Sequence, residues 1–314
     1  MDRNRKILLS ILAILLFTAV IAIVDVTLKM KHLEEVRQTA RKYTGPGVGV
    51  VRVEGPIELS SGNAPMGVIS SGEYVIKRLD NLIHDRKIKA IVVRINSPGG
   101  TASAAQAVFE KLMKIRKKHI PLIASMGDVA ASGGYLIASA CDIIFANHST
   151  MTGSIGVITA SPELKKLFDT YGINMNVIKS GKYKDIFSMH RTMTIDEKKL
   201  LQNMIDLSYK KFVSDIARAR NINQMELMKY ADGRIFLGIQ AFNFKPKLVD
   251  KIGTFEEAIS HARKKGKLSK NAPVYEDIKS PFENIINNFS TMMGVKKFLS
   301  FFKKSHIVEY RYMK

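Results

Sequence analysis

The chain of 314 residues is 46% hydrophobic and carries a formal net charge of +21. This is enough apolar material for one large folded domain with appendages. The charge fits nucleic acid, an anionic membrane surface or an acidic substrate, but neither zinc-finger cysteine pairs nor an RNA-binding aromatic motif accompanies it, which argues against nucleic acid. The lone Cys141 cannot form an intrachain disulfide, and its apolar surroundings predict a buried structural thiol.

The N-terminus combines a short basic segment, residues 1–6, with an apolar run at residues 7–24. The run has no charged residue and is just long enough to cross a bilayer as a helix. No small-residue cleavage site follows it, so we expect an uncleaved signal anchor rather than a signal peptide that is removed. Cations flank both ends, and the short N-terminal cluster favours a single-pass protein of the cell membrane with a cytoplasmic N-terminus and an extracytoplasmic catalytic domain.

A juxtamembrane stalk at 25–47 precedes the predicted catalytic domain, residues 48–262. Strand-like and helical stretches alternate in this domain, which indicates an α/β fold. The predicted strands are 48–57, 89–96, 121–126, 142–147 and 174–180, and the predicted helices are 71–86, 101–118, 162–171 and 194–219. Thr194 and Glu197 form a capping-box pattern at the start of the last helix, whose apolar face, including Leu200, Leu201, Met204, Ile205 and Phe212, is expected to pack.

Three glycine-marked segments stand beside predicted strand ends: NSPGG at 96–100, GDVAASGGYLIA at 127–138 and TGSIGV at 152–157. Ser132 lies in the second, where a strand gives way to a helix. Its small neighbours allow a substrate carbonyl to approach, and the amides of Gly99 and Gly133 are candidate oxyanion donors. From the residues alone, however, a helix cap is the commoner role for such a serine.

A serine nucleophile needs a base, and none of the histidines lies in a recognisable triad motif. The chain also lacks the G-x-S-x-G elbow, the HExxH metal motif and a P-loop. A serine paired with a lysine is therefore the attractive alternative.

The segments NSPGG, MGDVAASGGYLIA, TGSIGVI and SGKYKD, in this order, resemble the signal peptide peptidase A family of Ser/Lys peptidases, and so does the later run GRIFLGIQAFNFKPKLVDKIG. The likeness extends from about residue 48 to 260 and implies a crotonase/ClpP-like fold of ββα units, one catalytic domain per chain. It assigns Ser132 as nucleophile, Lys184 as general base and Ser154 as the residue that positions the lysine. Gly99 and Gly133 match the oxyanion hole, and neither a metal nor a cofactor is implied.

The proposed base must be neutral near pH 7, although the reference pKa of a lysine is about 10.4. Burial in an apolar, glycine-lined groove would favour the neutral amine. Two neighbours of Lys184 complicate the assignment: Lys182 could be mistaken for the base, and Asp185 would raise the lysine pKa by pairing with it. We therefore expect Asp185 to face elsewhere. Without the family resemblance, both lysines are most simply solvated surface charges.

The resemblance also implies partners. Short members of the family form rings over the membrane in which serine and lysine come from neighbouring protomers, so we expect a homo-oligomer, an octamer, with shared sites. The expected substrates are signal-peptide remnants and other apolar peptides from the membrane. Two alternatives remain: a crotonase-like acyl-CoA enzyme, disfavoured by the membrane anchor and the AASGGY serine, and a non-catalytic membrane scaffold, disfavoured by the presence of Ser132 and Lys184.

Residues 263–314 form a basic tail with twelve Lys and Arg against four Asp and Glu. Apolar residues between 282 and 302 recur at helical spacing among lysines, which is a basic amphipathic pattern. The tail could lie on anionic lipid or pack on the catalytic domain or a neighbouring protomer. A third role, suggested by the resemblance, is binding in the protein's own active-site groove.

Overall fold

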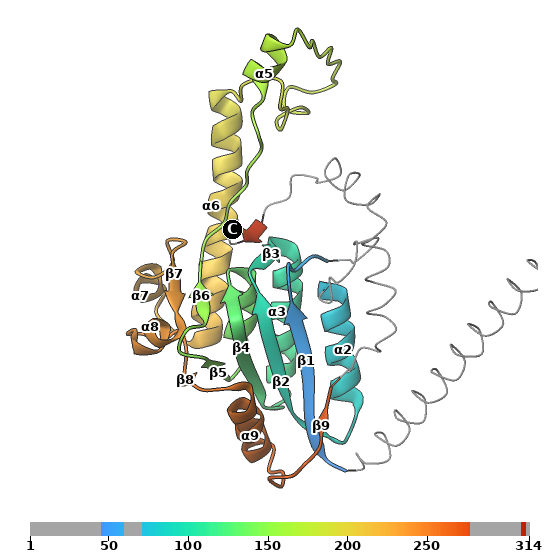
Figure 1. Cartoon of the computed structure of the whole chain (residues 1–314), viewed down its shortest axis with the longest axis vertical. Helices are drawn as coiled ribbons and strands as arrows, with labels where there is room; N and C mark the ends of the chain where they lie inside the picture. Colours follow the sequence, from blue (N-terminus) through green and yellow to red (C-terminus); the bar gives the residue numbers. More distant parts are fainter. Residues whose placement is uncertain (1–44, 60–70, 277–308, 312–314) are drawn as a thin grey trace, which may run out of the picture. The chain divides into compact units, whose positions relative to one another are not determined.

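The structure is a computed structural model that describes residues 45–59, 71–276 and 309–311 (Figure 1). Its first elements are β1 (Gly47–Glu54), α2 (Gly72–His84), β2 (Ile88–Ser97), β3 (Gly99–Thr101), α3 (Ala102–Arg116), β4 (Leu122–Ala131), α4 (Gly133–Ser139), β5 (Ile143–Ala146) and β6 (Met151–Gly153). Then follow α5 (Lys165–Thr170), α6 (Ile195–Arg220), α7 (Gln224–Met228), β7 (Ile235–Leu237), α8 (Gly238–Asn243), β8 (Lys251–Ile252), α9 (Phe255–Lys265), β9 (Val274–Tyr275) and β10 (Glu309–Arg311). The predicted α/β class is confirmed.

The main sheet is mostly parallel and has the strand order β7-β6-β4-β2-β1-β9, with β5 pairing with β4 and β8 with β5. β4 occupies the centre: its first half pairs with β2 and β5, and its last three residues pair with β6. Since β2, β4 and β6 run parallel, their carboxyl ends meet at one edge of the sheet, the usual place for a site in such folds. The three glycine-marked segments lie at these strand ends.

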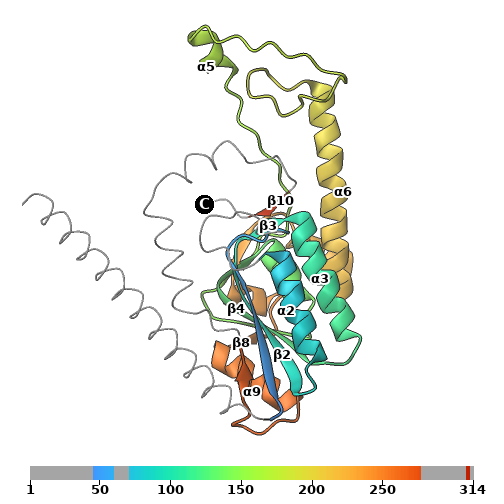
Figure 2. The same cartoon turned by 90° about the vertical axis from the view of Figure 1, so that its right-hand side faces the viewer.

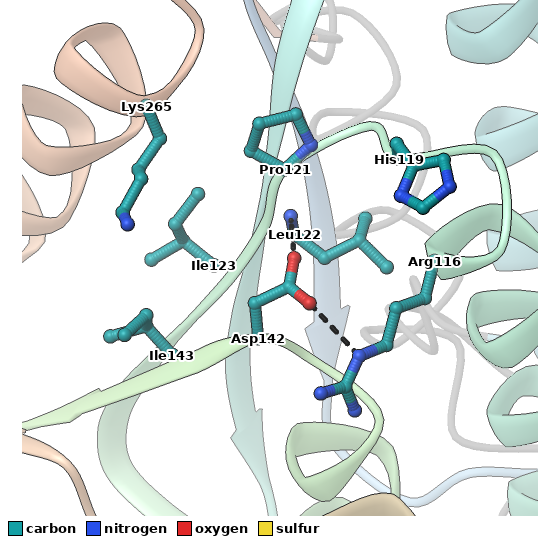
Figure 3. Close-up of a pocket in the computed structure, with 8 residues that line it drawn as sticks. All are labelled: Arg116, His119, Pro121, Leu122, Ile123, Asp142, Ile143 and Lys265. Atoms are coloured by element: carbon teal, nitrogen blue, oxygen red, sulfur yellow. Dashed lines mark hydrogen bonds and ion pairs between the residues drawn. The ribbon is translucent and has the colours of Figure 1, made fainter.

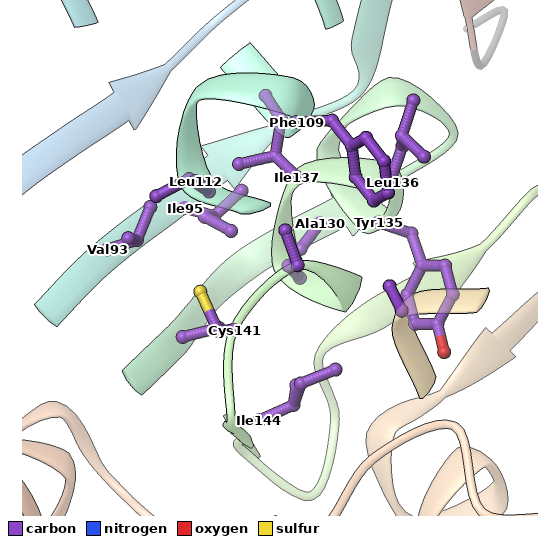
Figure 4. Packing of buried hydrophobic residues seen from close by; sticks show 14 of the residues in the cluster. Val93, Ile95, Phe109, Leu112, Ala130, Tyr135, Leu136, Ile137, Cys141 and Ile144 are labelled. Carbon is purple, nitrogen blue, oxygen red and sulfur yellow. The ribbon is translucent and has the colours of Figure 1, made fainter. Parts of the chain in front are cut away.

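Alternate strand residues face two hydrophobic clusters on opposite sides of the sheet. Along β2, Val93 and Ile95 belong to the larger cluster, which includes residues of α2, α3, α4 and α6, whereas Val92 faces α9. Figure 4 shows Phe109 of α3 among the larger cluster, and full burial of such a side chain stabilises the fold by about 1.5–3 kcal/mol. Cys141 is also fully buried there, as predicted for a structural thiol, and this burial raises its pKa.

Helix α6 begins as the sequence predicts. The Thr194 side chain accepts from the Glu197 amide and the Glu197 side chain accepts from the Thr194 amide, so the capping box is confirmed. The expected packing of the whole apolar face is wrong within this chain: Phe212 is fully buried, but Leu200 and Met204 are 40% and 46% exposed. Only the C-terminal part of α6 rests on the larger cluster.

Residues 157–211, here called the arm, include α5 and the N-terminal part of α6. At a rise of 1.5 Å per residue, the first residue of α6 lies roughly 25 Å along the helix from Phe212. Both views show α5 and the segment that follows it at the end of α6 remote from the sheet (Figures 1 and 2). The strand predicted at 174–180 is wrong, because this segment is exposed and forms no strand with any other described segment.

Two predicted segments, the membrane anchor at 7–24 and the amphipathic pattern at 282–302, lie outside the described residues. Across residues 45–59, 71–276 and 309–311, no helix has both the length and the apolar character needed to cross a bilayer.

Candidate active site

Ser132 occupies the single position between the end of β4 and the start of α4. Its backbone angles, φ 54° and ψ −120°, lie where a residue with a side chain is strained. Two hydrogen bonds hold it there: its amide donates to Gly153 O at 2.8 Å, and Leu136 N donates to Ser132 O at 3.0 Å. The fold thus imposes an unfavourable conformation on this serine.

The Ser132 hydroxyl is fully buried and has no hydrogen-bond partner among the residues that the structure describes. Its side chain caps no amide of α4, so the helix-cap interpretation is wrong. By contrast, Ser139 in the same helix is equally buried, but its hydroxyl donates to Leu136 O at 2.7 Å. An unpaired buried hydroxyl is costly, and the local conformation directs this one to where no described group of the protein satisfies it.

The glycines around Ser132 allow a very close backbone approach. A Cβ on Gly133 would lie 2.9 Å from Ala105 Cβ and 3.6 Å from both Gly99 Cα and Gly100 N. The structure therefore brings together the two predicted oxyanion positions, Gly99 and Gly133, beside the candidate nucleophile.

The two predicted oxyanion donors differ in their present partners. Gly133 N–H belongs to the first turn of α4, where an amide has no partner within the helix. Gly99 N–H instead donates to Ser97 Oγ at 3.1 Å, and that hydroxyl donates to Gly55 O at 2.6 Å. Sequence reasoning missed Ser97, a buried residue that holds the Gly99 amide.

Ser154 lies next to Ser132 through strand pairing. β4 and β6 are parallel, and Ala131 is paired with Gly153. Ser132 and Ser154 directly follow these two residues, where the paired backbones are roughly 5 Å apart. Ser154 is buried, has a φ of 49°, and its amide donates to Arg234 O at 2.8 Å. The strand register therefore places Ser154 beside the candidate nucleophile.

Lys184 is not brought to Ser132 within the chain. It lies in the arm, in an exposed turn where its amide donates to Gly181 O at 3.2 Å, and the Ser132 hydroxyl contacts no described lysine. Its neighbour Asp185 accepts from Lys179 and Arg191 and so faces away from it, as expected.

The arm is unusually apolar for an exposed part of a protein. Of the nineteen exposed large hydrophobic residues in the described part of the chain, thirteen belong to it. They are Ile158, Leu167, Tyr171, Ile173, Met175, Val177, Ile178, Tyr183, Met189, Ile195, Leu200, Met204 and Leu207. A concentration of this kind marks a surface that another protein or membrane covers.

Strand β10, in the basic tail, lies beside β3, the strand that contains Gly99. Ile57 N donates to Gly99 O at 2.9 Å and Thr101 N donates to Ile57 O at 2.8 Å. Alternate strand residues bond to opposite edges, so the Gly100 backbone faces the other edge of β3. There β10 pairs antiparallel with β3, placing Tyr310 opposite Gly100.

A cavity of about 340 Å³ lies at the start of β4 and β5, at the other end of the sheet from Ser132 (Figure 3). It is crossed by an ion pair between Arg116 Nε and Asp142 Oδ1 at 2.9 Å, and Asp142 also accepts from Leu122 N. Leu122 and Ser132 stand at opposite ends of β4, roughly 30 Å apart along the strand. The cavity is therefore separate from the candidate active site.

The profile of Peptidase family S49 matches residues 114–269, and that of Clp protease matches residues 69–152. A Synechocystis sp. relative named as a protease, slr0021, is 44% identical over 61% of this chain and 69% of its own length. An Enterococcus faecium relative named for signal peptide peptidase SppA is 34% identical over 62% of this chain and 56% of its own. Serine protease SPPA, chloroplastic, of Arabidopsis thaliana is 34% identical over 73% of this chain and 32% of its own.

The mixed sheet, the strained serine and these similarities define a serine peptidase with a Clp-protease-like α/β fold. The chain belongs to peptidase family S49, and the resemblance to the signal peptide peptidase A family is confirmed.

Proposed function

We propose that this protein is a membrane-anchored serine endopeptidase that uses Ser132 and Lys184 to degrade cleaved signal peptides and other membrane-derived peptides. The buried, unpaired and strained Ser132 carries the proposal. Strain and missing hydrogen bonds cost free energy, and they concentrate where a group must remain available for chemistry. The family membership supports the same role for this serine.

The general base comes from a second copy of the chain. Lys184 is exposed in its own chain and lies in the apolar arm, whose segment after α5 stands at the end of α6 remote from the sheet (Figures 1 and 2). Docking of the arm on a neighbouring copy would cover its apolar side chains and take the lysine out of water, which favours the neutral amine needed in a base. A homo-oligomer, proposed as an octameric ring, would complete every site in this way.

An extended peptide would bind along β3. The Gly100 backbone faces the edge at which β10 pairs antiparallel, and that edge leads to Gly99 and to Ser132. Backbone pairing with a sheet edge gives affinity without strong sequence preference, which suits a peptidase that clears varied remnants. The substrate backbone would take the place that β10 occupies.

The reaction would proceed in two transfers. Ser132 Oγ attacks the peptide carbonyl carbon as its proton passes to Lys184 Nζ, and the oxyanion accepts hydrogen bonds from glycine amides beside Ser132. The lysine then gives the proton to the departing amine, leaving an acyl group on Ser132. In the second transfer, Lys184 Nζ takes a proton from water as the water oxygen attacks the acyl carbon. The acyl group leaves as a carboxylic acid, and the lysine returns the proton to Ser132 Oγ. Ser154 would hold the incoming lysine from its position beside Ser132.

The membrane location rests on the apolar run at 7–24 and the basic residues before it. An uncleaved anchor there keeps the peptidase domain at the membrane surface outside the cytoplasm, where remnants leave the bilayer.

The test is hydrolysis of a panel of fluorogenic apolar peptides by detergent-purified protein. We expect Ser132→Ala and Lys184→Ala each to lower kcat by at least about 10³-fold, because members of such a pair act as a unit. Lys182→Ala is the matched control and should keep full activity, since Lys182 pairs with Asp196 on the arm surface. Activity that persists in Ser132→Ala refutes the mechanism, and a wild type inert to the whole panel favours the scaffold alternative.

A further inference from the structure

One ion-pair network fixes the turn that carries Lys184. Arg191 donates from Nε and Nη2 to the two carboxylate oxygens of Asp185, both at 2.9 Å, and from Nη2 to the Asp185 backbone carbonyl at 3.0 Å. Its Nη1 and Nη2 also donate to Glu197, at 2.9 and 2.6 Å. One guanidinium thus binds the residue next to the proposed base and the first turn of α6.

The network is built from well-covered side chains, although it lies on the exposed arm. The side chains of Asp185 and Glu197 are only 11% and 3% exposed, and that of Arg191 is 25% exposed. Glu197 is held a second time, because its carboxylate also accepts from the Thr194 amide. A planar guanidinium that satisfies two carboxylates in fixed geometry gives far more rigidity than a mobile surface pair.

Charges within the network are balanced. Asp185 also accepts from Lys179 Nζ at 2.5 Å, so two cations meet the two carboxylates of Asp185 and Glu197. Hydrogen bonds from Arg191 hold the pKa of Asp185 well below its usual range, with Lys179 adding to the effect. Hydrogen bonds from Arg191 and from the Thr194 amide lower the pKa of Glu197 to about 2. Both carboxylates are therefore ionised and fully engaged at neutral pH.

We propose that Arg191 is a positioning residue for the Lys184 base: it fixes the 181–188 turn to the start of α6 and keeps the Asp185 carboxylate away from the lysine. This inference rests on the proposed dyad. A free carboxylate next to Lys184 would stabilise its ammonium form and oppose the proton transfer from serine. The family resemblance assigns the lysine but not the contacts that hold its turn. The five hydrogen bonds of Arg191 to Asp185 and Glu197 supply those contacts.

The neighbouring Lys182 provides a matched comparison. It lies in the same turn and also reaches the first turn of α6, where its Nζ pairs with Asp196 at 3.0 Å. Both of these side chains are at least 60% exposed. An exposed single pair of this kind fixes little, so Lys182→Gln should leave the turn and the activity unchanged.

The first measurement is hydrogen exchange in the full-length protein, which does not require activity. The amides of Lys184, Ile186 and Ser188 donate within the turn, at 3.2, 3.2 and 2.9 Å. Arg191→Gln should speed exchange over 181–188 by at least about tenfold, because the charge-assisted bonds that hold the turn are lost. Lys182→Gln should leave exchange unchanged.

The second measurement is the rate of peptide hydrolysis as a function of pH. Arg191→Gln should lower kcat by about 10- to 100-fold with little change in KM, because small misplacements of a catalytic group are costly. The acid limb of kcat/KM should move to higher pH, and adding Asp185→Asn should move it back; a merely structural role lowers the plateau and leaves the limb in place. Arg191→Lys should restore activity only in part.

Arg191→Gln with wild-type exchange over 181–188 and a wild-type pH profile overturns the inference. A wrong Ser132/Lys184 dyad gives a different result: Lys184→Ala would stay active, or the wild type would be inert. The hydrogen-exchange measurement would still report whether Arg191 holds the turn.

Discussion

Ser132 is predicted to lower the stability of the fold that contains it. Its hydroxyl is fully buried without a partner, and such a group costs about 1–3 kcal/mol. Ser132→Ala removes the hydroxyl, keeps the backbone angles and leaves only a small void. We therefore expect the free energy of unfolding to rise by about 1–2 kcal/mol, which corresponds to a Tm increase of roughly 2–8 °C for a domain of this size. The same change is predicted to abolish peptide hydrolysis.

Ser139→Ala is the matched control, since Ser139 is equally buried on α4 but donates to Leu136 O. Its loss should lower the free energy of unfolding by about 1 kcal/mol. Both variants are made in a Lys184→Ala background, so that no lysine of another copy pairs with Ser132. Thermal unfolding is followed by far-UV circular dichroism in detergent. Ser139→Ala should melt below its parent. A Ser132→Ala variant that also melts below its parent would show that the buried Ser132 hydroxyl does not destabilise the fold.

Three further predictions concern the surroundings of the site. Glu197 should titrate near pH 2 by carboxyl NMR; because its folded pKa is lowered from 4.5, its stabilising contribution is present above pH 4.5 and lost as pH falls towards 2, and Arg191→Gln should return the midpoint towards 4.5. Gly133→Ala should lower the free energy of unfolding by about 1–3 kcal/mol in a denaturant titration, because its Cβ would press on Ala105. Gly181→Ala, where a Cβ meets open space, should melt like wild type. Truncation before β10 should lower KM for peptides by freeing the β3 edge, and an unchanged KM would contradict this pairing as the peptide site.

The sequence predicts the sheet and the strand-to-helix position of Ser132 well. Apolar strand runs and glycine-marked strand ends are local signals, and the strained turn at Ser132 follows from an AASGG segment between a strand and a helix. The engagement of the Gly99 amide by Ser97 is not visible in the sequence, because a serine hydroxyl two residues away can point in several directions.

The arm is where sequence reasoning fails, for a physical reason. The run at 174–180 is typical of a strand, but a strand forms only where a neighbouring strand pairs with it, and none of the described strands does. The apolar face of α6 likewise predicts packing without saying against which chain. Both patterns are consistent with a surface that a second copy covers, as proposed for the shared site.

The most direct test of the shared Ser132/Lys184 dyad is a mixing experiment. Ser132→Ala and Lys184→Ala proteins, each inactive alone, are co-assembled in detergent and assayed on a fluorogenic peptide. Mixed assemblies are expected to regain activity, because an intact Ser132 of one copy would meet an intact Lys184 of its neighbour. Mixed assemblies that contain both variants and remain inactive would contradict a site completed between chains.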